Sequence, residues 1–138
     1  MILLDTTVVS EPLKPAPSQT VIDWLDGQAS GNLCISAVTV MEMLDGAARL
    51  EIGARRLRLE EAIHSLIPRF KCLPFDEFAA RSYAQLAEKA RRAGQSVSMG
   101  DAQIAAIAHS SGIEVVATRD TAPFEAMGIQ VVNPWLDN

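Results

Sequence analysis

The sequence predicts an α/β protein built around a parallel β-sheet. Short apolar runs alternate with longer helical patterns along the whole chain, and this alternation is typical of strands joined by helical crossovers. Each apolar run is three to five residues long and is followed by polar or turn-forming residues, as expected for buried strands. A chain of 138 residues has room for one core of ordinary size, so we expect residues 1–138 to form a single domain.

Five segments have the length and composition of strands. Proline cannot donate a hydrogen bond to a neighbouring strand, so Pro74 predicts that the third segment lies at an edge of the sheet. The predicted strands are Met1–Leu4, Leu33–Ile35, Lys71–Phe75, Glu114–Ala117 and Ile129–Val132.

Helices are predicted between the strands from their apolar spacing and their capping residues. The first predicted helix is capped by Ser18 and ended by Gly27, and the second is capped by Ser36 and begins near Val38. The third covers Glu51–Ile67 and is ended by Pro68. The fourth is capped by Asp76 and runs to Gly94, and the fifth runs from about Asp101 to Ser111. The second and third should form a hairpin. The small, polar stretch 94–100 is the candidate for a mobile loop beside a site.

The overall composition narrows the possible functions. The chain has 17 acidic and 12 basic residues, a net charge of −5, so a nucleic-acid substrate would need a local cation and not a broad basic surface. No apolar run approaches the roughly 18 residues of a membrane span, and Asp5 interrupts the apolar start before a signal peptide could form. We therefore expect a cytoplasmic protein. Cys34 and Cys72 lie in predicted interior strands and should be buried, reduced thiols.

Four acidic residues are placed to share one site. Asp5 and Asp120 follow predicted strands, and the carboxyl ends of parallel strands meet at one edge of a sheet, where ligands bind. Asp101 opens a helix and shares the apolar stripe of that helix. Glu42 lies one turn before Gly46, whose missing side chain would let another backbone approach the carboxylate.

Such a group of carboxylates predicts a cation. Two carboxylates ~4 Å apart repel by about 1 kcal/mol in water and by about 4 kcal/mol at an intermediate dielectric constant. Carboxylate oxygens with few histidines or thiols nearby suit Mg²⁺ or Mn²⁺ and not zinc. An ion held there could activate water for phosphodiester hydrolysis. Each acid also has a structural explanation: a turn for Asp5, a solvated flank for Glu42, a helix dipole for Asp101 and a cap for Asp120.

Other polar and aromatic residues are expected to be structural. His64 and His109 lie on predicted helices away from the acids, and neither is assigned catalysis. The basic residues of two predicted helices are expected mainly to solvate exposed faces; they are Arg55, Arg56, Arg58, Lys89, Arg91 and Arg92. The scattered aromatic residues are expected in the core; they are Trp24, Phe70, Phe78 and Phe124.

Four motifs in register resemble those of PIN-domain toxins of the VapC type. They are Met1-Ile-Leu-Leu-Asp-Thr-Thr, Ser36-Ala-Val-Thr-Val-Met-Glu with Gly46 beyond it, Asp101-Ala-Gln-Ile, and Ala117-Thr-Arg-Asp-Thr121, and the closing Asn133-Pro-Trp135 is similar to the FitB-like subgroup. The resemblance implies a parallel sheet of strand order 3-2-1-4-5. It also implies a Mg²⁺-dependent endoribonuclease, with Mn²⁺ as a possible substitute. The protein would be a toxin neutralised by a VapB-type antitoxin, a homodimer, and in contact with DNA only through that antitoxin.

The resemblance also implies roles for individual residues. Asp5 and Asp101 would be the principal metal ligands, Glu42 would hold the metal directly or through water, and Asp120 would complete the catalytic quartet. Supporting hydrogen bonds would come from Thr6, Thr7, Ser36 and Thr118. Thr7 departs from the pattern, because relatives often carry Asn or Ser there, and a hydroxyl can still orient a carboxylate.

Three other functions fit part of the sequence. A phosphatase of the haloacid-dehalogenase type would use Asp5 as nucleophile, but Thr7 replaces the second Asp of that motif. A response-regulator receiver would need an adjacent pair of acids after its first strand, and the chain lacks one. A non-catalytic α/β binding module would use the acids only as caps, and predicts that Asp101→Asn leaves function unchanged.

Overall fold

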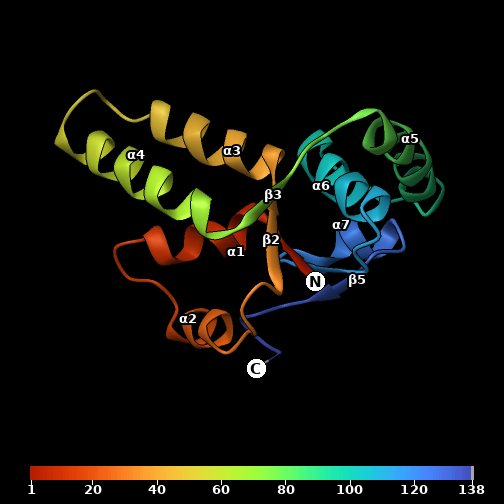
Figure 1. Ribbon diagram of the computed structural model, residues 1–138. Coiled ribbons are helices and arrows are strands. Elements are labelled where there is room, and N and C mark those ends of the chain that lie inside the picture. Colours follow the sequence, from red (N-terminus) through yellow and green to blue (C-terminus); the bar gives the residue numbers. More distant parts are fainter. Residues whose placement is uncertain (138) are drawn as a thin grey trace.

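The computed structural model describes residues 1–137. Five parallel strands form one sheet in the order β3-β2-β1-β4-β5 (Figure 1), which confirms the predicted fold class and strand order. The strands are β1 (Ile2–Leu4), β2 (Leu33–Ser36), β3 (Lys71–Leu73), β4 (Val115–Ala117) and β5 (Gln130–Val132). β3 lies at an edge, as Pro74 predicted, and it ends immediately before that proline because a proline cannot extend the pairing.

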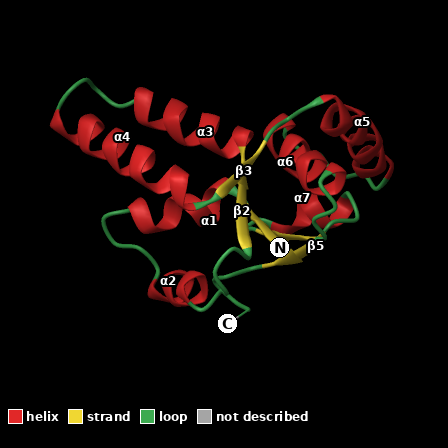
Figure 2. Ribbon diagram, in the orientation of Figure 1, coloured by secondary structure: helices red, strands yellow, loops and turns green. Residues whose placement is uncertain are grey.

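Helices cover both faces of the sheet, and α3 and α4 form the predicted hairpin, which projects to one side (Figure 2). The helices are α1 (Thr6–Ser10), α2 (Gln19–Asp26), α3 (Ala37–Ala48), α4 (Ala54–Leu66), α5 (Glu77–Arg92), α6 (Met99–Ser110) and α7 (Thr121–Ala126), with short 3-10 helices η1 (Glu11–Leu13) and η2 (Ile67–Arg69). The short α1 and η1 were not predicted from the sequence.

Alternate strand residues build two separate cores. Leu3, Cys34 and Val116 point to the face covered by α5, α6 and α7, whereas Leu4 and Ile35 point to the face covered by α1 to α4. This follows from the two-residue period of a strand. Full burial of each such side chain contributes about 1.5–3 kcal/mol, so both faces hold the carboxyl ends of the strands in fixed positions.

Side-chain caps fix the starts of three helices. Ser36, Asp76 and Ser98 each accept a hydrogen bond from the backbone N–H three residues later, which satisfies a donor that the helix itself leaves unpaired. Ser18 occupies the N-cap position of α2, as predicted. Its side chain makes no capping bond; instead its backbone N–H donates to the Glu11 carboxylate at 3.0 Å.

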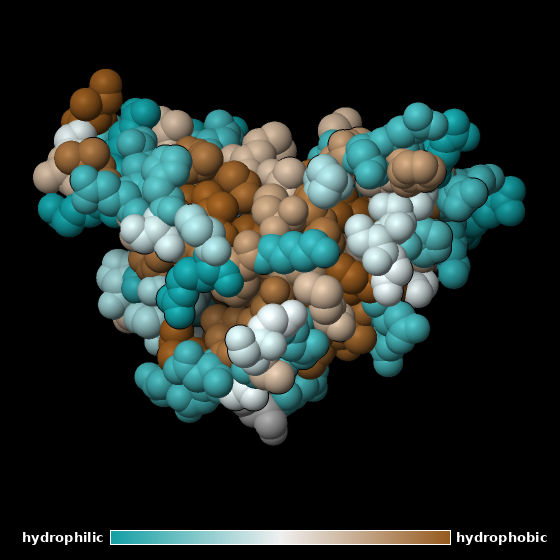
Figure 3. Space-filling view, viewed as in Figure 1, coloured by the Kyte–Doolittle hydropathy of each residue, from teal (hydrophilic) through white to brown (hydrophobic). Residues whose placement is uncertain are grey.

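Two predictions of burial are corrected by the structure. Cys34 is buried, and desolvation raises its pKa to about 11, but Cys72 is exposed because β3 is an edge strand. Phe78 is 69% exposed near the start of α5, whereas Trp24 and Phe124 are buried as predicted. Figure 3 shows apolar side chains gathered in the middle of one face, with hydrophilic residues around its outer parts.

No helix within residues 1–137 combines the length and the apolar character that crossing a membrane requires.

Candidate active site

Asp5 stands at the carboxyl end of β1, where the strand turns into α1. Its side chain is only 5% exposed and accepts three hydrogen bonds. They come from Thr6 N at 2.7 Å, Thr7 Oγ1 at 3.0 Å and Thr118 Oγ1 at 2.9 Å. Every partner is a donor, so the surroundings suit an ionised carboxylate held in one orientation. The expected support by Thr6, Thr7 and Thr118 is present in the structure.

Asp120 lies just beyond β4, the strand next to β1. Its backbone N–H donates to Thr118 Oγ1 at 3.2 Å, so Thr118 links the backbone of Asp120 to the carboxylate of Asp5. The Asp120 residue occupies the N-cap position of α7, yet its side chain makes no capping bond. A capping role therefore does not explain this carboxylate, which is exposed to solvent.

Glu42 projects from α3, the helix that follows β2. Its Oε1 accepts a hydrogen bond of 2.9 Å from Thr6 Oγ1. The predicted role of Gly46 was wrong, because nothing lies within 4 Å of the place where a Cβ at Gly46 would stand. The close approach occurs instead at Gly100 on α6, where a Cβ would stand 3.4 Å from Glu42 Oε2. A larger side chain at Gly100 would push against the carboxylate.

Asp101 lies in the first turn of α6, and the helix begins earlier than the sequence suggested. α6 starts at Met99 and its cap is Ser98, which accepts the backbone N–H of Asp101 at 3.1 Å. Burial and then repulsion from Asp5 raise the pKa of Asp101 to about 6, with further repulsion from Glu42 and Asp120. At one edge of the sheet, the structure thus places Asp5, Glu42 and Asp120 close enough to Asp101 to repel its negative charge.

Ser36 does not contact any of the four acids. Its Oγ accepts the backbone N–H of Thr39 at 3.0 Å and lies 3.3 Å from Thr39 Oγ1. Thr39 in turn lies 3.0 Å from Thr6 Oγ1, so the link from Ser36 to the acids is indirect. Thr39 was not singled out from the sequence, because a threonine inside a helix carries no distinctive pattern.

The donor set suits a hard divalent cation. Within residues 1–137, no three His, Cys, Asp or Glu side chains stand close enough to enclose an ion by themselves. Mg²⁺ usually takes one or two protein carboxylates and completes its shell with water and phosphate, whereas structural zinc needs a closed set of His and Cys ligands. A carboxylate at Asp101 that three other acids repel, with donor hydroxyls behind those acids, therefore fits Mg²⁺ or Mn²⁺ and not zinc.

Comparison with known proteins assigns the family. Residues 2–129 match the family described as PIN domain. This chain is a PIN-domain protein. It is 45% identical over 140 residues to VapC ribonuclease Y4jK of Sinorhizobium fredii, covering 98% of each chain. It is 43% identical over 140 residues to Toxin FitB of Neisseria gonorrhoeae, covering 99% of this chain and all of the relative.

A solved structure shares the fold closely. The structure described as FitAB bound to IR36 DNA fragment superposes on this PIN domain with a TM-score of 0.87 and 42% sequence identity, over 98% of this chain and 96% of the other. The resemblance to the VapC type and its FitB-like subgroup is thereby confirmed. Membership of the PIN family also removes the haloacid-dehalogenase phosphatase and the receiver domain as explanations of Asp5.

The closing motif of the PIN domain holds the residue beside Asp120. The Arg119 guanidinium stacks over the Trp135 ring, 5.0 Å from its centroid. The Asn133 side chain donates to Arg119 O at 3.4 Å, and Arg119 N donates to Thr7 Oγ1 at 3.4 Å. The motif Asn133-Pro-Trp135 therefore holds both the backbone and the guanidinium of Arg119, the residue before Asp120.

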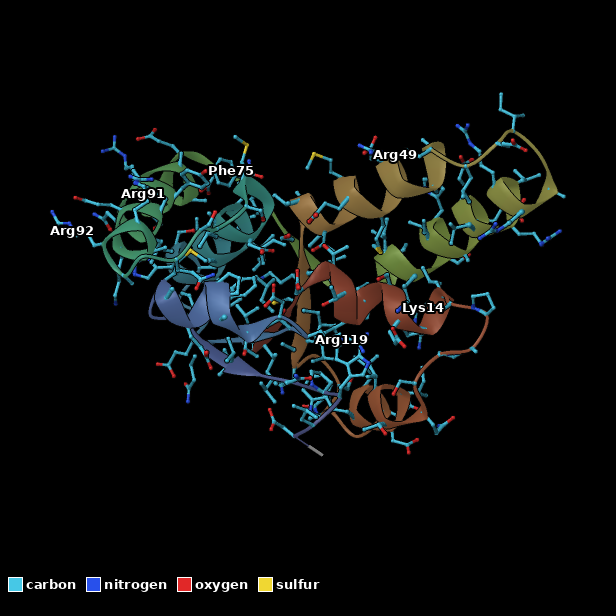
Figure 4. All side chains as sticks on the ribbon, turned by 180° about the vertical axis from the view of Figure 1, so that it is seen from behind. Lys14, Arg49, Phe75, Arg91, Arg92 and Arg119 are labelled. Carbon is cyan, nitrogen blue, oxygen red and sulfur yellow. The ribbon has the colours of Figure 1, made fainter. Side chains whose placement is uncertain are left out.

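Three other arginines of the PIN domain lie on outer parts of its helices. Figure 4 shows Arg91 and Arg92 on the outer side of α5 and Arg49 at the far end of α3, whereas Arg119 lies below α1 near the middle of the molecule. Arg92 and Arg49 pair with acids on their own helices. The ion pair of Arg92 and the exposure of Arg55, Arg58, Lys89 and Arg91 agree with the solvating role predicted for these residues.

The histidines take no part in the acidic site. His64 is exposed on α4. His109 lies in the last turn of α6, where its Nδ1 is 3.1 Å from Ser82 Oγ. Neither histidine is among the groups that shift the pKa of Asp101.

Glu11 is a buried acid to which sequence analysis gave no role. Its side chain is 5% exposed and pairs with Lys14 Nζ at 2.8 Å. This hydrogen bond from Lys14 lowers the pKa of Glu11 despite the opposing effect of burial. Together with the bond to Ser18 N, the contact ties the connection after α1 in place. Nothing in the sequence predicted a buried Glu11, because a charged residue next to apolar ones is more often exposed.

Proposed function

We propose that this protein is a divalent-metal-dependent endoribonuclease and the toxin of a toxin–antitoxin pair. The observation that carries the proposal is the repulsion felt by Asp101. Burial raises its pKa most, and three other acids on separate elements of the fold, Asp5, Glu42 and Asp120, raise it further. A protein that gathers four carboxylates at the carboxyl edge of a parallel sheet gains from a bound cation there. The name ribonuclease of the 45% identical relative supports the same activity.

We assign Mg²⁺ as the ion, with Mn²⁺ as a substitute. Asp5 and Asp101 would hold it, Glu42 would bind it directly or through water, and Asp120 would complete the set. When bound, such an ion supplies a more acidic water and offsets negative charge on phosphorus.

The chain's own hydroxyls prepare the site for this chemistry. Thr7 and Thr118 donate to the same Asp5 oxygen, Oδ2, while Thr6 N donates to Oδ1. Both oxygens are therefore oriented before any substrate arrives, and no energy of reorganisation is needed at the moment of reaction. Gly100 leaves space beside Glu42 Oε2, where a side chain would otherwise exclude water or substrate.

The partners follow from the relatives. The relative FitB is named a toxin, and the FitAB structure includes a DNA fragment. We therefore propose a VapB-type antitoxin as the protein partner, with DNA contacted only through the resulting complex, and we place the protein in the cytoplasm. Assembly into a homodimer and a single domain over residues 1–138 remain predictions.

Cleavage of a mixed RNA pool by the purified protein tests the proposed activity. In Mg²⁺ the wild-type protein is expected to produce discrete fragments, and excess chelator is expected to stop cleavage until Mg²⁺ or Mn²⁺ is restored. Undiminished cleavage in chelator would refute metal dependence. Absence of cleavage, together with metal-independent binding of a protein or nucleic-acid partner, would favour the non-catalytic binding module.

Arg119→Gln is expected to weaken RNA binding. The slope of log affinity against log salt concentration should become smaller by about one, as expected for the loss of one phosphate contact. Arg119 directly precedes Asp120, its backbone bonds to Thr7 and Asn133, and its guanidinium is held over Trp135. A net charge of −5 leaves RNA dependent on such local charge. Filter binding over a salt series measures the effect. Arg91→Gln, on the outer side of α5 (Figure 4), is the control, and equal losses in both variants would contradict the assignment.

A further inference from the structure

A chain of three hydroxyl groups leads from the core to the Glu42 carboxylate. Ser36 and Thr39 have no exposed surface. Ser36 Oγ lies 3.3 Å from Thr39 Oγ1, which lies 3.0 Å from Thr6 Oγ1, which lies 2.9 Å from Glu42 Oε1. The chain joins β2, α3 and α1, and it ends on an acid of the candidate active site.

The protons of this chain can point in only one direction. An ionised carboxylate has no proton, so the Thr6 hydroxyl must donate to Glu42. Thr6 has only that one hydroxyl proton, so the 3.0 Å contact with Thr39 requires Thr39 to donate to Thr6. Thr39 then has no proton left, and Ser36 must donate to Thr39. The resulting order runs from Ser36 through Thr39 and Thr6 to Glu42, and aligned hydrogen bonds of this kind strengthen one another.

The capping role of Ser36 does not explain why residue 39 carries a hydroxyl group. The Ser36 side chain caps α3 by accepting Thr39 N at 3.0 Å, and this contact uses only the backbone of Thr39. Valine has the same shape as threonine and would pack equally well at this buried position. The hydroxyl of Thr39 is therefore explained by what it contacts, which is Thr6.

Glu42 is the kind of side chain that needs such support. It is exposed, and an exposed glutamate loses rotamer freedom when it is held in one conformation. The chain holds Oε1 and leaves Oε2 facing Gly100 at the start of α6, beside Asp101.

We infer that Thr39 is a positioning residue that fixes the Glu42 carboxylate through Thr6. The inference rests on the proposed function for its consequence in catalysis, but the orientation of Glu42 can be measured without it. Thr39 touches neither substrate nor acid, so its removal should loosen Glu42 and leave the rest of the acidic edge unchanged.

The test compares full-length wild-type protein with Thr39→Val and Thr39→Ser. Side-chain three-bond couplings of Glu42, measured by NMR on the metal-free protein, are expected to indicate one rotamer in the wild type. They should become averaged in Thr39→Val and return to the wild-type values in Thr39→Ser. Calorimetric titration without RNA should show Mg²⁺ affinity lowered about tenfold in Thr39→Val, a usual cost of losing a residue that orients a ligand.

Ser82→Ala is the matched control, because Ser82 is also a buried hydroxyl but bonds to His109. It should lose similar stability with no change at Glu42. Should Thr39→Val fail to fold, Thr6→Val breaks the same chain nearer its exposed end. Unchanged Glu42 couplings in a folded variant would overturn the inference. Averaged couplings with unchanged Mg²⁺ affinity and RNA cleavage would uphold the positioning role and refute the function proposed for Glu42.

Discussion

Asp5→Asn is expected to lower the rate of RNA cleavage by roughly a thousandfold, which corresponds to about 4 kcal/mol of lost transition-state stabilisation. The substitution removes the negative charge that three donors orient at the end of β1. The fold should survive, because the Thr7 and Thr118 hydroxyls can turn and accept from the new amide. Single-turnover cleavage in Mg²⁺, with circular dichroism to verify folding, measures the effect.

Asp23→Asn provides the control for this prediction. Asp23 is exposed on α2 and accepts a hydrogen bond from Gln19 at 2.8 Å, so the same chemical change occurs there without touching the acidic edge. Its cleavage rate should equal that of the wild type. Near-wild-type cleavage by Asp5→Asn would remove Asp5 from the proposed site.

Asp101→Asn is expected to stabilise the metal-free protein by about 1–2 kcal/mol above pH 7. Burial and repulsion by the other acids raise the pKa of Asp101 from 3.8 to about 6. A difference of about two pKa units corresponds to roughly 3 kcal/mol, which we reduce because the side chain is partly exposed to solvent and screened. Asparagine has no charge and therefore escapes this penalty.

The stabilisation by Asp101→Asn depends on pH. Because the pKa is raised in the folded state, the folded protein holds the Asp101 proton more tightly than the unfolded chain does. Wild-type stability is therefore lost as the pH rises from the ordinary value of 3.8 through about 6. The advantage of Asp101→Asn should appear over this interval and stay constant above it. Urea unfolding in chelator across the same range measures it, and a variant less stable than the wild type at pH 8 would contradict the account.

Much of the fold could be predicted because it depends on local patterns. The apolar runs that became β1 and β4 are short and sharply bounded, and the caps Ser36 and Asp76 stand directly before their helices. The errors concern neighbours that are distant in sequence. Cys72 lies in an apolar segment of the sequence, but this segment forms the edge strand β3 and the cysteine is exposed. Ser18 stands at the N-cap position of α2, but its side chain makes no capping bond, and its backbone N–H donates to Glu11.

The acids of the site could be predicted for a similar reason, whereas the neighbours of Glu42 could not. Asp5 and Asp120 follow strands, and a parallel sheet brings strand ends to one edge. The wrong glycine was chosen beside Glu42, because Gly46 is near it in sequence while Gly100 is near it in space. Thr39 shows no signal at all, since its importance depends on contacts with Thr6 on another element.

The central claim is that these four acids hold a divalent cation at the carboxyl edge of the sheet. Paramagnetic broadening by Mn²⁺, followed in the amide NMR spectrum of the full-length protein, tests it most directly. At low Mn²⁺, broadening is expected to be strongest for the backbone signals of Thr6, Asp101 and Asp120. Mg²⁺ should reverse this broadening, and Asp5→Asn should greatly reduce it. Broadening centred on another part of the protein, or equal broadening in Asp5→Asn, would contradict the claim.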